Sequence, residues 1–156
     1  MPMLNFQNQI RFDLGAITKL QDALNRLGIQ RPLLVTDRGL RDNGVLERIT
    51  GVLEDSSSAK TYDGTPGNPT EEAVAEALEY FQENECDGVV CIGGGSPMDL
   101  GKAVALLADS GGPLAQYDPL KGGNKLVKGV APLIAIPTTS GTVSYTHLRA
   151  HETSGY

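Results

Sequence analysis

Short apolar runs alternate with helically spaced apolar residues along the chain. The runs predict buried strands, of which the second in chain order is the weakest, at residues 32–36, 59–62, 87–92 and 132–136. Apolar side chains that recur every three or four residues predict helices at residues 17–27, 40–53, 71–81 and 97–108. Strands that alternate with helices in this way form parallel βαβ units. The pattern therefore predicts an α/β fold with a doubly wound, mainly parallel sheet.

Only some loops of such a sheet are expected to bind a ligand. Ligands bind beyond the carboxyl ends of the strands, so the loops after Thr36, Ile92 and Ile136 are the ones expected to carry chemistry. Residues 63–69 are dense in turn-forming types, and Thr70 is placed to cap the helix that follows. We therefore look for a ligand site in the loops at the carboxyl edge of the sheet.

The strongest local signal is a glycine-rich segment between the third predicted strand and its helix. Three consecutive glycines, residues 93–95, let the backbone turn sharply and bring its N–H groups close to an anion. We expect Ser96 to be the N-cap, Pro97 the first helical residue and Asp99 the third, in a variant of the capping box. The spacing is neither that of a Walker A loop nor that of the Rossmann G-x-G-x-x-G fingerprint. The segment is a candidate pyrophosphate loop, and the alternative is a capped helix with a flexible entrance.

Composition and charge narrow the class of partner. The 156 residues suffice for about one domain, and a hydrophobic content of 40% is ordinary for a globular protein. A net charge of −6 without a basic stripe argues against nucleic acid and favours a small-molecule ligand. Neither a signal peptide nor an apolar stretch of the roughly 20 residues that a membrane helix needs is visible, so we expect a cytoplasmic protein. Cys86 and Cys91 are expected to be reduced, buried and structural.

A family resemblance becomes visible at the glycine-rich segment. Residues 93–102, GGGSPMDLGK, closely resemble the GGGSxxDxxK signature of the iron-containing (group III) alcohol dehydrogenases. Three further segments resemble the same family in the same order, namely LLVTDRGL at 33–40, GNPT at 67–70 and IPTTSGT at 136–142. The resemblance covers about residues 6–142 and implies a Rossmann-like N-terminal domain. The family adds a helical C-terminal domain to it, and we expect this sequence to lack that domain.

The resemblance implies a set of cofactor-binding residues. Asp37 would accept hydrogen bonds from the adenosine ribose, and its charge favours NAD over NADP, whose extra phosphate it would repel. Gly94, Gly95 and Ser96 would hold the pyrophosphate, and Asn68 would line the cofactor groove. The hydroxyl groups around the phosphates and the nicotinamide would come from Thr138, Thr139 and Thr142.

Each of these positions also has a local explanation. Asp37 can cap the helix that follows its strand, and Asn68 can be a simple turn former. The Pro-Thr-Thr segment at 137–139 can be an ordinary helix entrance. Lys102 lies on the helix rather than in the loop, so we rank it below the loop residues as a ligand contact.

The resemblance also implies an activity. In the family an Asp and three His residues of the C-terminal domain bind a divalent metal, usually iron or zinc, which polarises an alcohol or carbonyl substrate for hydride exchange with the nicotinamide. We predict no catalytic residue and no metal ligand here, so the chain would be the cofactor-binding part of an NAD(P)-dependent dehydrogenase, homo-oligomeric at full length and inactive by itself. The alternatives are a glycerol dehydrogenase or maleylacetate reductase of the same superfamily, and a non-catalytic nucleotide-binding fragment.

The last fourteen residues depart from the family pattern. We expect residues 1–142 to form the nucleotide-binding domain and residues 143–156 to be a non-native or disordered tail, because SYTHLRAHET resembles a translated sequencing-adapter string. Genuine coding sequence downstream in the source DNA would contradict this hypothesis. His147 and His151 would share one face of a helix and so form a metal-binding pair, but a frayed end is the stronger interpretation.

Overall fold

The structure is a computed structural model that describes residues 8–13, 16–68, 70–112, 129–139 and 142–151, with side chains over 17–68, 70–112 and 129–138. In chain order its elements are β1 (Asn8–Asp13), η1 (Ala16–Lys19), α1 (Leu20–Leu27), β2 (Pro32–Val35), α2 (Arg38–Asp42), α3 (Val45–Thr50), η2 (Ser56–Ser58), β3 (Lys60–Tyr62), α4 (Glu71–Glu83), β4 (Gly88–Gly93), α5 (Gly95–Ser110), β5 (Leu133–Thr139) and β6 (Thr142–His151). No helix among the described residues is long and apolar enough to cross a membrane.

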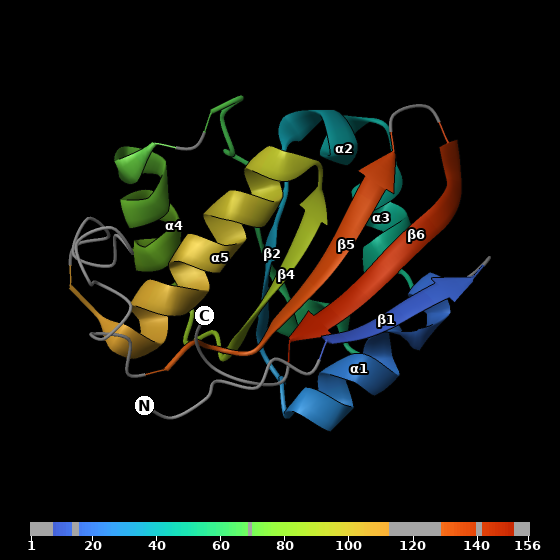
Figure 1. Cartoon of the computed structure of the whole chain (residues 1–156), viewed down its shortest axis with the longest axis horizontal. Helices are drawn as coiled ribbons and strands as arrows, with labels where there is room; N and C mark the ends of the chain where they lie inside the picture. Colours follow the sequence, from blue (N-terminus) through green and yellow to red (C-terminus); the bar gives the residue numbers. More distant parts are fainter. Residues whose placement is uncertain (1–7, 14–15, 69, 113–128, 140–141, 152–156) are drawn as a thin grey trace.

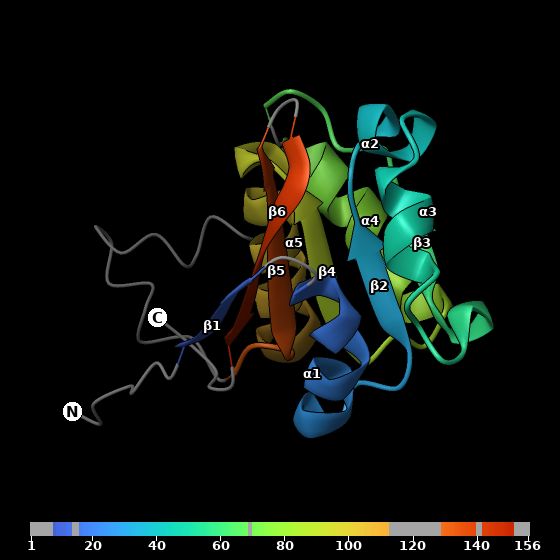
Figure 2. The same cartoon turned by 90° about the vertical axis from the view of Figure 1, so that its right-hand side faces the viewer.

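The described strands form one sheet in the order β1-β6-β5-β4-β2-β3 (Figure 1). Strands β3, β2, β4 and β5 are parallel to one another, whereas β6 runs antiparallel to both β5 and β1. Figures 1 and 2 show α4 and α5 on one face of this sheet and α1 and α3 on the other. This arrangement confirms the doubly wound, mainly parallel α/β fold.

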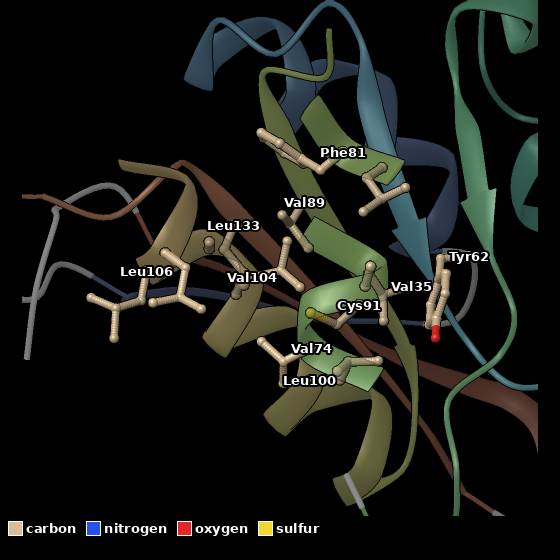
Figure 3. Close-up of a cluster of buried hydrophobic side chains, with 14 of the residues drawn as sticks. Val35, Tyr62, Val74, Phe81, Val89, Cys91, Leu100, Val104, Leu106 and Leu133 are labelled. Carbon is tan, nitrogen blue, oxygen red and sulfur yellow. The ribbon is translucent and has the colours of Figure 1, made fainter. Parts of the chain in front are cut away.

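Both faces of the parallel strands are buried. Successive side chains of a strand point to opposite faces, so Val89 and Cys91 pack against α4 and α5, whereas Val90 and Ile92 pack against α1 and α3. Figure 3 shows the first of these clusters, with Leu100 and Val104 of α5 facing the sheet. Burial on both faces explains why the sequence of these strands is continuously apolar rather than alternating.

Helix α5 lies unusually close to β4 at one point. A Cβ atom placed on Gly101 would lie 2.0 Å from Cys91 Sγ and 3.3 Å from Val89 Cγ1. Only a glycine leaves room for the thiol at this crossing, which brings the start of α5 close to the end of β4 and so positions the loop between them.

The helical segments begin and end close to where the pattern predicts. Helix α1 is preceded by the short 3₁₀ segment η1 and ends at Gly28, whose N–H bonds to the carbonyls of Leu24 and Asn25. The helical region expected at 40–53 is divided into α2 and α3, because Gly44, with a φ of 88°, interrupts the helix. The weak strand expected at 59–62 is present as β3.

The two strands at one end of the sheet, β1 and β6, were not predicted from the sequence. Residues Thr142–His151 form β6, which corrects the expectation of disorder for this segment, and β1 pairs with β6 along its whole length. Strand β5 also continues to Thr139 instead of ending at Ile136. The non-native origin of residues 143–156 stays a hypothesis that only the source DNA tests.

The two cysteines are free, and burial raises the pKa of both. Cys91 is fully buried and its pKa rises to about 12, although Lys102 partly opposes the shift. Cys86 is half-buried, and its burial and the charge of Asp87 raise its pKa to about 11. The burial expected for both thiols is thus complete for Cys91 and partial for Cys86.

We therefore expect both thiols to be unreactive in the folded chain. At pH 7.5 iodoacetamide should label neither cysteine until urea unfolds the protein, because only the thiolate is nucleophilic. Since the folded pKa values lie above the ordinary thiol value of 9.0, the thiols stabilise the fold fully below pH 9 and lose this contribution as the pH rises toward about 12. Rapid labelling of Cys91 under native conditions, followed by mass spectrometry, would contradict the burial that the fold gives it.

Candidate functional site

The order of the parallel strands defines where a ligand can bind. The chain passes from β2 outward to β3 and then returns to place β4 on the other side of β2. The strand order therefore reverses between β2 and β4, and in doubly wound sheets the crevice at the carboxyl ends of such a pair is the ligand site. In Figure 1 this edge carries α2 and the first turn of α5.

The glycine loop, residues 93–96, leaves β4 at this crevice. Gly93 has a φ of 137°, and a Cβ there would lie 2.8 Å from Pro97 Cγ and 3.0 Å from Leu40 Cδ1. Its conformation and its neighbours both require glycine. By contrast, nothing lies within 4 Å of a Cβ placed on Gly94 or Gly95, so this side of the loop is open.

The N-terminus of α5 faces this open space without a side-chain cap. Gly94 is its N-cap, and no side chain among the described residues accepts a hydrogen bond from the first-turn N–H groups. The first amides of a helix lack intrahelical partners and lie at the positive end of the helix dipole. The open glycines and the uncapped sixteen-residue helix together fit an anion such as a pyrophosphate.

The capping pattern expected for this helix is wrong. The helix begins at Gly95 rather than Pro97, because the φ of Gly93 turns the chain directly at the end of the strand. Ser96 is therefore the second helical residue and not the N-cap, and the exposed Asp99 is too far along the helix to complete a capping box. The Ser96 hydroxyl instead donates to the carbonyl of Gly67 at 2.5 Å.

Asp37 lies at the end of β2, beside the glycine loop across the strand-order reversal. Its Oδ1 accepts the N–H of Leu40 at 2.9 Å, so Asp37 is the N-cap of α2. The geometry thus confirms the local explanation, in which Asp37 caps the helix that follows its strand. The ribose contact that the family resemblance implies stays a prediction, and it would fall to the other carboxylate oxygen.

The loop at residues 63–68, which we call the 63–68 loop, is tied to the ends of the neighbouring elements. Thr65 Oγ1 donates to the carbonyl of Thr36 at 2.7 Å, and Gly64 forms an antiparallel bridge with Asp37. Asp63 pairs with Arg41 of α2. Asn68 follows directly after Gly67 and is exposed, so the structure brings it to the rim of the crevice beside the glycine loop.

The threonines after Ile136 lie in strands rather than in a loop. Pro137 is the register partner of Gly93, which places Thr138 next to the glycine loop, and the Thr138 side chain is half-buried. Thr139 pairs with Thr142 where β5 turns into β6, beyond a register shift at 138–139. The side chains of Thr139 and Thr142 lie outside the described residues, so their predicted cofactor contacts stay predictions.

Two residues of the site were not predicted from the sequence. Thr36 is completely buried at the end of β2, and its hydroxyl has no hydrogen-bond partner among the described residues. Thr65 supplies the bond that holds the 63–68 loop to the carbonyl of Thr36. Such a bond spans 29 residues of sequence, so no local pattern announces it.

Metal ligands do not gather anywhere in the described part of the chain. No group of three or more His, Cys, Asp or Glu residues there is able to hold a metal ion. His147 and His151 lie in strand β6, not in a helix, and four strand residues span about 13 Å. The helical pairing considered for these two histidines is therefore wrong.

A strand-order reversal, a glycine loop that opens a helix there and an acidic residue after the neighbouring strand β2 define a nucleotide-binding domain of the doubly wound class. Residues 7–150 match the family model of the iron-containing alcohol dehydrogenases. The chain belongs to this family, as the four sequence motifs implied.

Individual relatives agree with this assignment. The chain is 43% identical over 145 residues to 4-hydroxybutyrate dehydrogenase of Cupriavidus necator, covering 92% of this chain and 38% of that protein. The crystal structure of a 1,3-propanediol oxidoreductase superposes with a TM-score of 0.75 at 29% identity, covering 95% of this chain and 42% of that one. Sulfoacetaldehyde reductase from Bifidobacterium kashiwanohense, solved in complex with NAD+, superposes with a TM-score of 0.71 at 26% identity, covering 92% of this chain and 38% of that one. The chain thus spans about two fifths of the length of these relatives and corresponds to the N-terminal part of the family.

Proposed function

We propose that the chain is the NAD-binding part of a metal-dependent alcohol dehydrogenase, which exchanges hydride between the nicotinamide and a small alcohol, aldehyde or ketone. The observation that carries the proposal is the uncapped start of α5, with Gly94 and Gly95 open to solvent at the strand-order reversal. Family membership and a relative solved with NAD+ support the choice of ligand.

The pyrophosphate, the adenosine ribose and the nicotinamide would each contact a different group of the protein. The first-turn N–H groups of Gly95 and Ser96 would donate to the pyrophosphate, which the positive end of the helix dipole also favours. The Asp37 carboxylate would accept from the adenosine ribose with the oxygen that does not cap α2. Asn68 would line the groove, and Thr138, Thr139 and Thr142 would bound its nicotinamide side.

The metal belongs, in this proposal, to a helical C-terminal domain of the full-length enzyme. A bound iron or zinc ion would act there as a Lewis acid on the substrate oxygen. Since the described residues contain no fitting cluster, we assign no ligand and no reaction step to this chain. By itself the chain would bind the cofactor without turnover, as a non-catalytic nucleotide-binding module.

The substrate is proposed only as a class. The relatives are named for 4-hydroxybutyrate, 1,3-propanediol and sulfoacetaldehyde, which are small molecules with an alcohol or a carbonyl group. A glycerol dehydrogenase or maleylacetate reductase remains the alternative within the superfamily. We further propose a cytoplasmic enzyme that forms a homo-oligomer at full length, with neither nucleic acid nor membrane as its partner.

Titration of the purified chain with NADH, followed by fluorescence, tests the proposal. We expect saturable binding that is the same with Zn²⁺ added and with a chelator present, and no oxidation of NADH when a small aldehyde is supplied. A folded chain that does not bind NADH would contradict the proposed cofactor site. Binding that requires metal would contradict the assignment of the metal to another domain.

Substitutions of Asp37 separate its capping role from its proposed cofactor role. Asn caps helices about as well as Asp, so Asp37→Asn should leave the free energy of unfolding nearly unchanged. Loss of the charge should shift the ratio of NADPH to NADH affinity by roughly tenfold toward NADPH. Asp37→Ala should show the same shift and also cost about 1 kcal/mol of stability, measured by urea denaturation. An unchanged affinity ratio in both variants would remove Asp37 from the cofactor site.

A further inference from the structure

Four of the six residues of the 63–68 loop bond to the elements around the crevice. Asp63 pairs with Arg41, Gly64 bridges to Asp37, and Thr65 Oγ1 donates to the carbonyl of Thr36. These three contacts all fasten the near end of the loop to β2 and α2, on one side of the strand-order reversal. They do not hold the other end of the loop, at Gly67 and Asn68, which lies toward β4 and the glycine loop.

The Ser96 hydroxyl is the attachment of that end. It donates to the carbonyl of Gly67, and it is the only bond among the described residues that joins the 63–68 loop to the glycine loop. Ser96 lies in the first turn of α5, next to the open Gly95. Its backbone N–H and its hydroxyl can therefore have different partners. The N–H belongs to the uncapped helix start, whereas the hydroxyl proton is committed to Gly67.

We propose that Ser96 is a positioning residue, whose hydroxyl draws the 63–68 loop across the strand-order reversal and so sets the place of Asn68 at the rim of the cofactor groove. Its side chain thus acts on the cofactor through the loop, and its own contact with the pyrophosphate is made by the backbone N–H. The inference rests on the proposed function for its consequence on cofactor affinity, but the attachment itself exists in the ligand-free chain.

The chain supplies well-matched variants for a test. Ser96→Ala removes the hydroxyl and keeps the backbone N–H, whereas Ser96→Thr keeps both. Ser58 also donates its hydroxyl to a carbonyl, that of Asp55 at 2.8 Å, in a local turn at the opposite end of β3. Ser58→Ala therefore removes a serine hydroxyl bond that joins no two loops, far from the crevice, and serves as the control.

Two readouts are needed, amide hydrogen exchange of the ligand-free chain and the dissociation constant for NADH. Ser96→Ala should speed exchange in the 63–68 loop by about fivefold to tenfold, leave the β4 core unchanged and weaken NADH binding by about threefold to tenfold. Ser96→Thr should restore both values to those of the wild type, and Ser58→Ala should alter neither.

The outcomes separate this inference from the proposed function. If loop exchange ignores Ser96→Ala, the attachment is overturned, and a loss of NADH affinity in that case would mean that the hydroxyl contacts the phosphate directly. If the loop loosens while NADH affinity is unchanged, the loop positions nothing and the inference also fails. If the wild-type chain does not bind NADH at all, the proposed function is what fails, and the exchange data still decide whether Ser96 holds the loop.

Discussion

Gly95→Ala is expected to weaken NADH binding by about tenfold to a hundredfold while leaving the folded chain as stable as before, or more stable by up to about 1 kcal/mol. Gly95 is the first residue of α5, its φ is not positive, and a Cβ there would meet nothing within 4 Å. Alanine therefore fits the protein and favours the helix. The methyl group would instead occupy the space through which a pyrophosphate must approach the first-turn amides.

Opposite signs in the two measurements make this prediction sharp. Affinity is measured by fluorescence titration and stability by urea denaturation of the same preparations. ADP-ribose, which carries the pyrophosphate, should lose affinity as NADH does, whereas any binding of adenosine should be unaffected. A variant that binds NADH as tightly as the wild type would show that the pyrophosphate does not lie against Gly95.

The second large effect is expected in the free energy of unfolding rather than in cofactor affinity. Gly101→Ala should destabilise the chain by more than about 3 kcal/mol, because its Cβ would lie 2.0 Å from Cys91 Sγ and α5 would have to move off β4. Gly95→Ala makes the same chemical change in the same helix without this contact, and it is the matched control.

A compensating variant distinguishes this clash from a general loss of helix packing. Cys91→Ala removes the sulfur atom, so the double variant Gly101→Ala with Cys91→Ala should recover most of the lost stability in a double-mutant cycle. We expect Cys91→Ala alone to cost about 1–2 kcal/mol from the cavity that it leaves. A double variant no more stable than Gly101→Ala would show that Cys91 is not what limits this position.

The fold was predictable where short segments of sequence contain the whole signal. Residues 88–92 are apolar at every position after the glycine because Val89 and Cys91 face one helical layer and Val90 and Ile92 the other. The same holds for residues 33–35 of β2. By contrast, β1 and β6 depend on pairing partners far away in the chain, since Asn8 and Leu133 both pair with His151. Neither segment is apolar enough for its sequence to predict a strand.

The site was predictable in its location but not in its contacts. Gly93 shows why the helix start was misplaced. Capping preferences favour Ser96, but the positive φ of Gly93 starts the helix two residues before the expected Pro97 and makes Gly94 the cap. The consequence, a serine hydroxyl released to bind Gly67, depends on a loop 29 residues away. Only the folded arrangement brings those two segments together.

In the proposed site NADH binds at the carboxyl ends of β2 and β4, with its pyrophosphate on the start of α5. The most direct measurement is a ¹⁵N-labelled NMR titration of the chain with NADH, which reports each backbone amide separately. We predict that the largest chemical-shift changes fall on the amides of Gly94, Gly95, Ser96 and Asp37, while those of Gln30 and Ser58 at the opposite edge of the sheet do not change. Shifts that gather at that opposite edge, or amides 94–96 that do not respond at saturation, would contradict it.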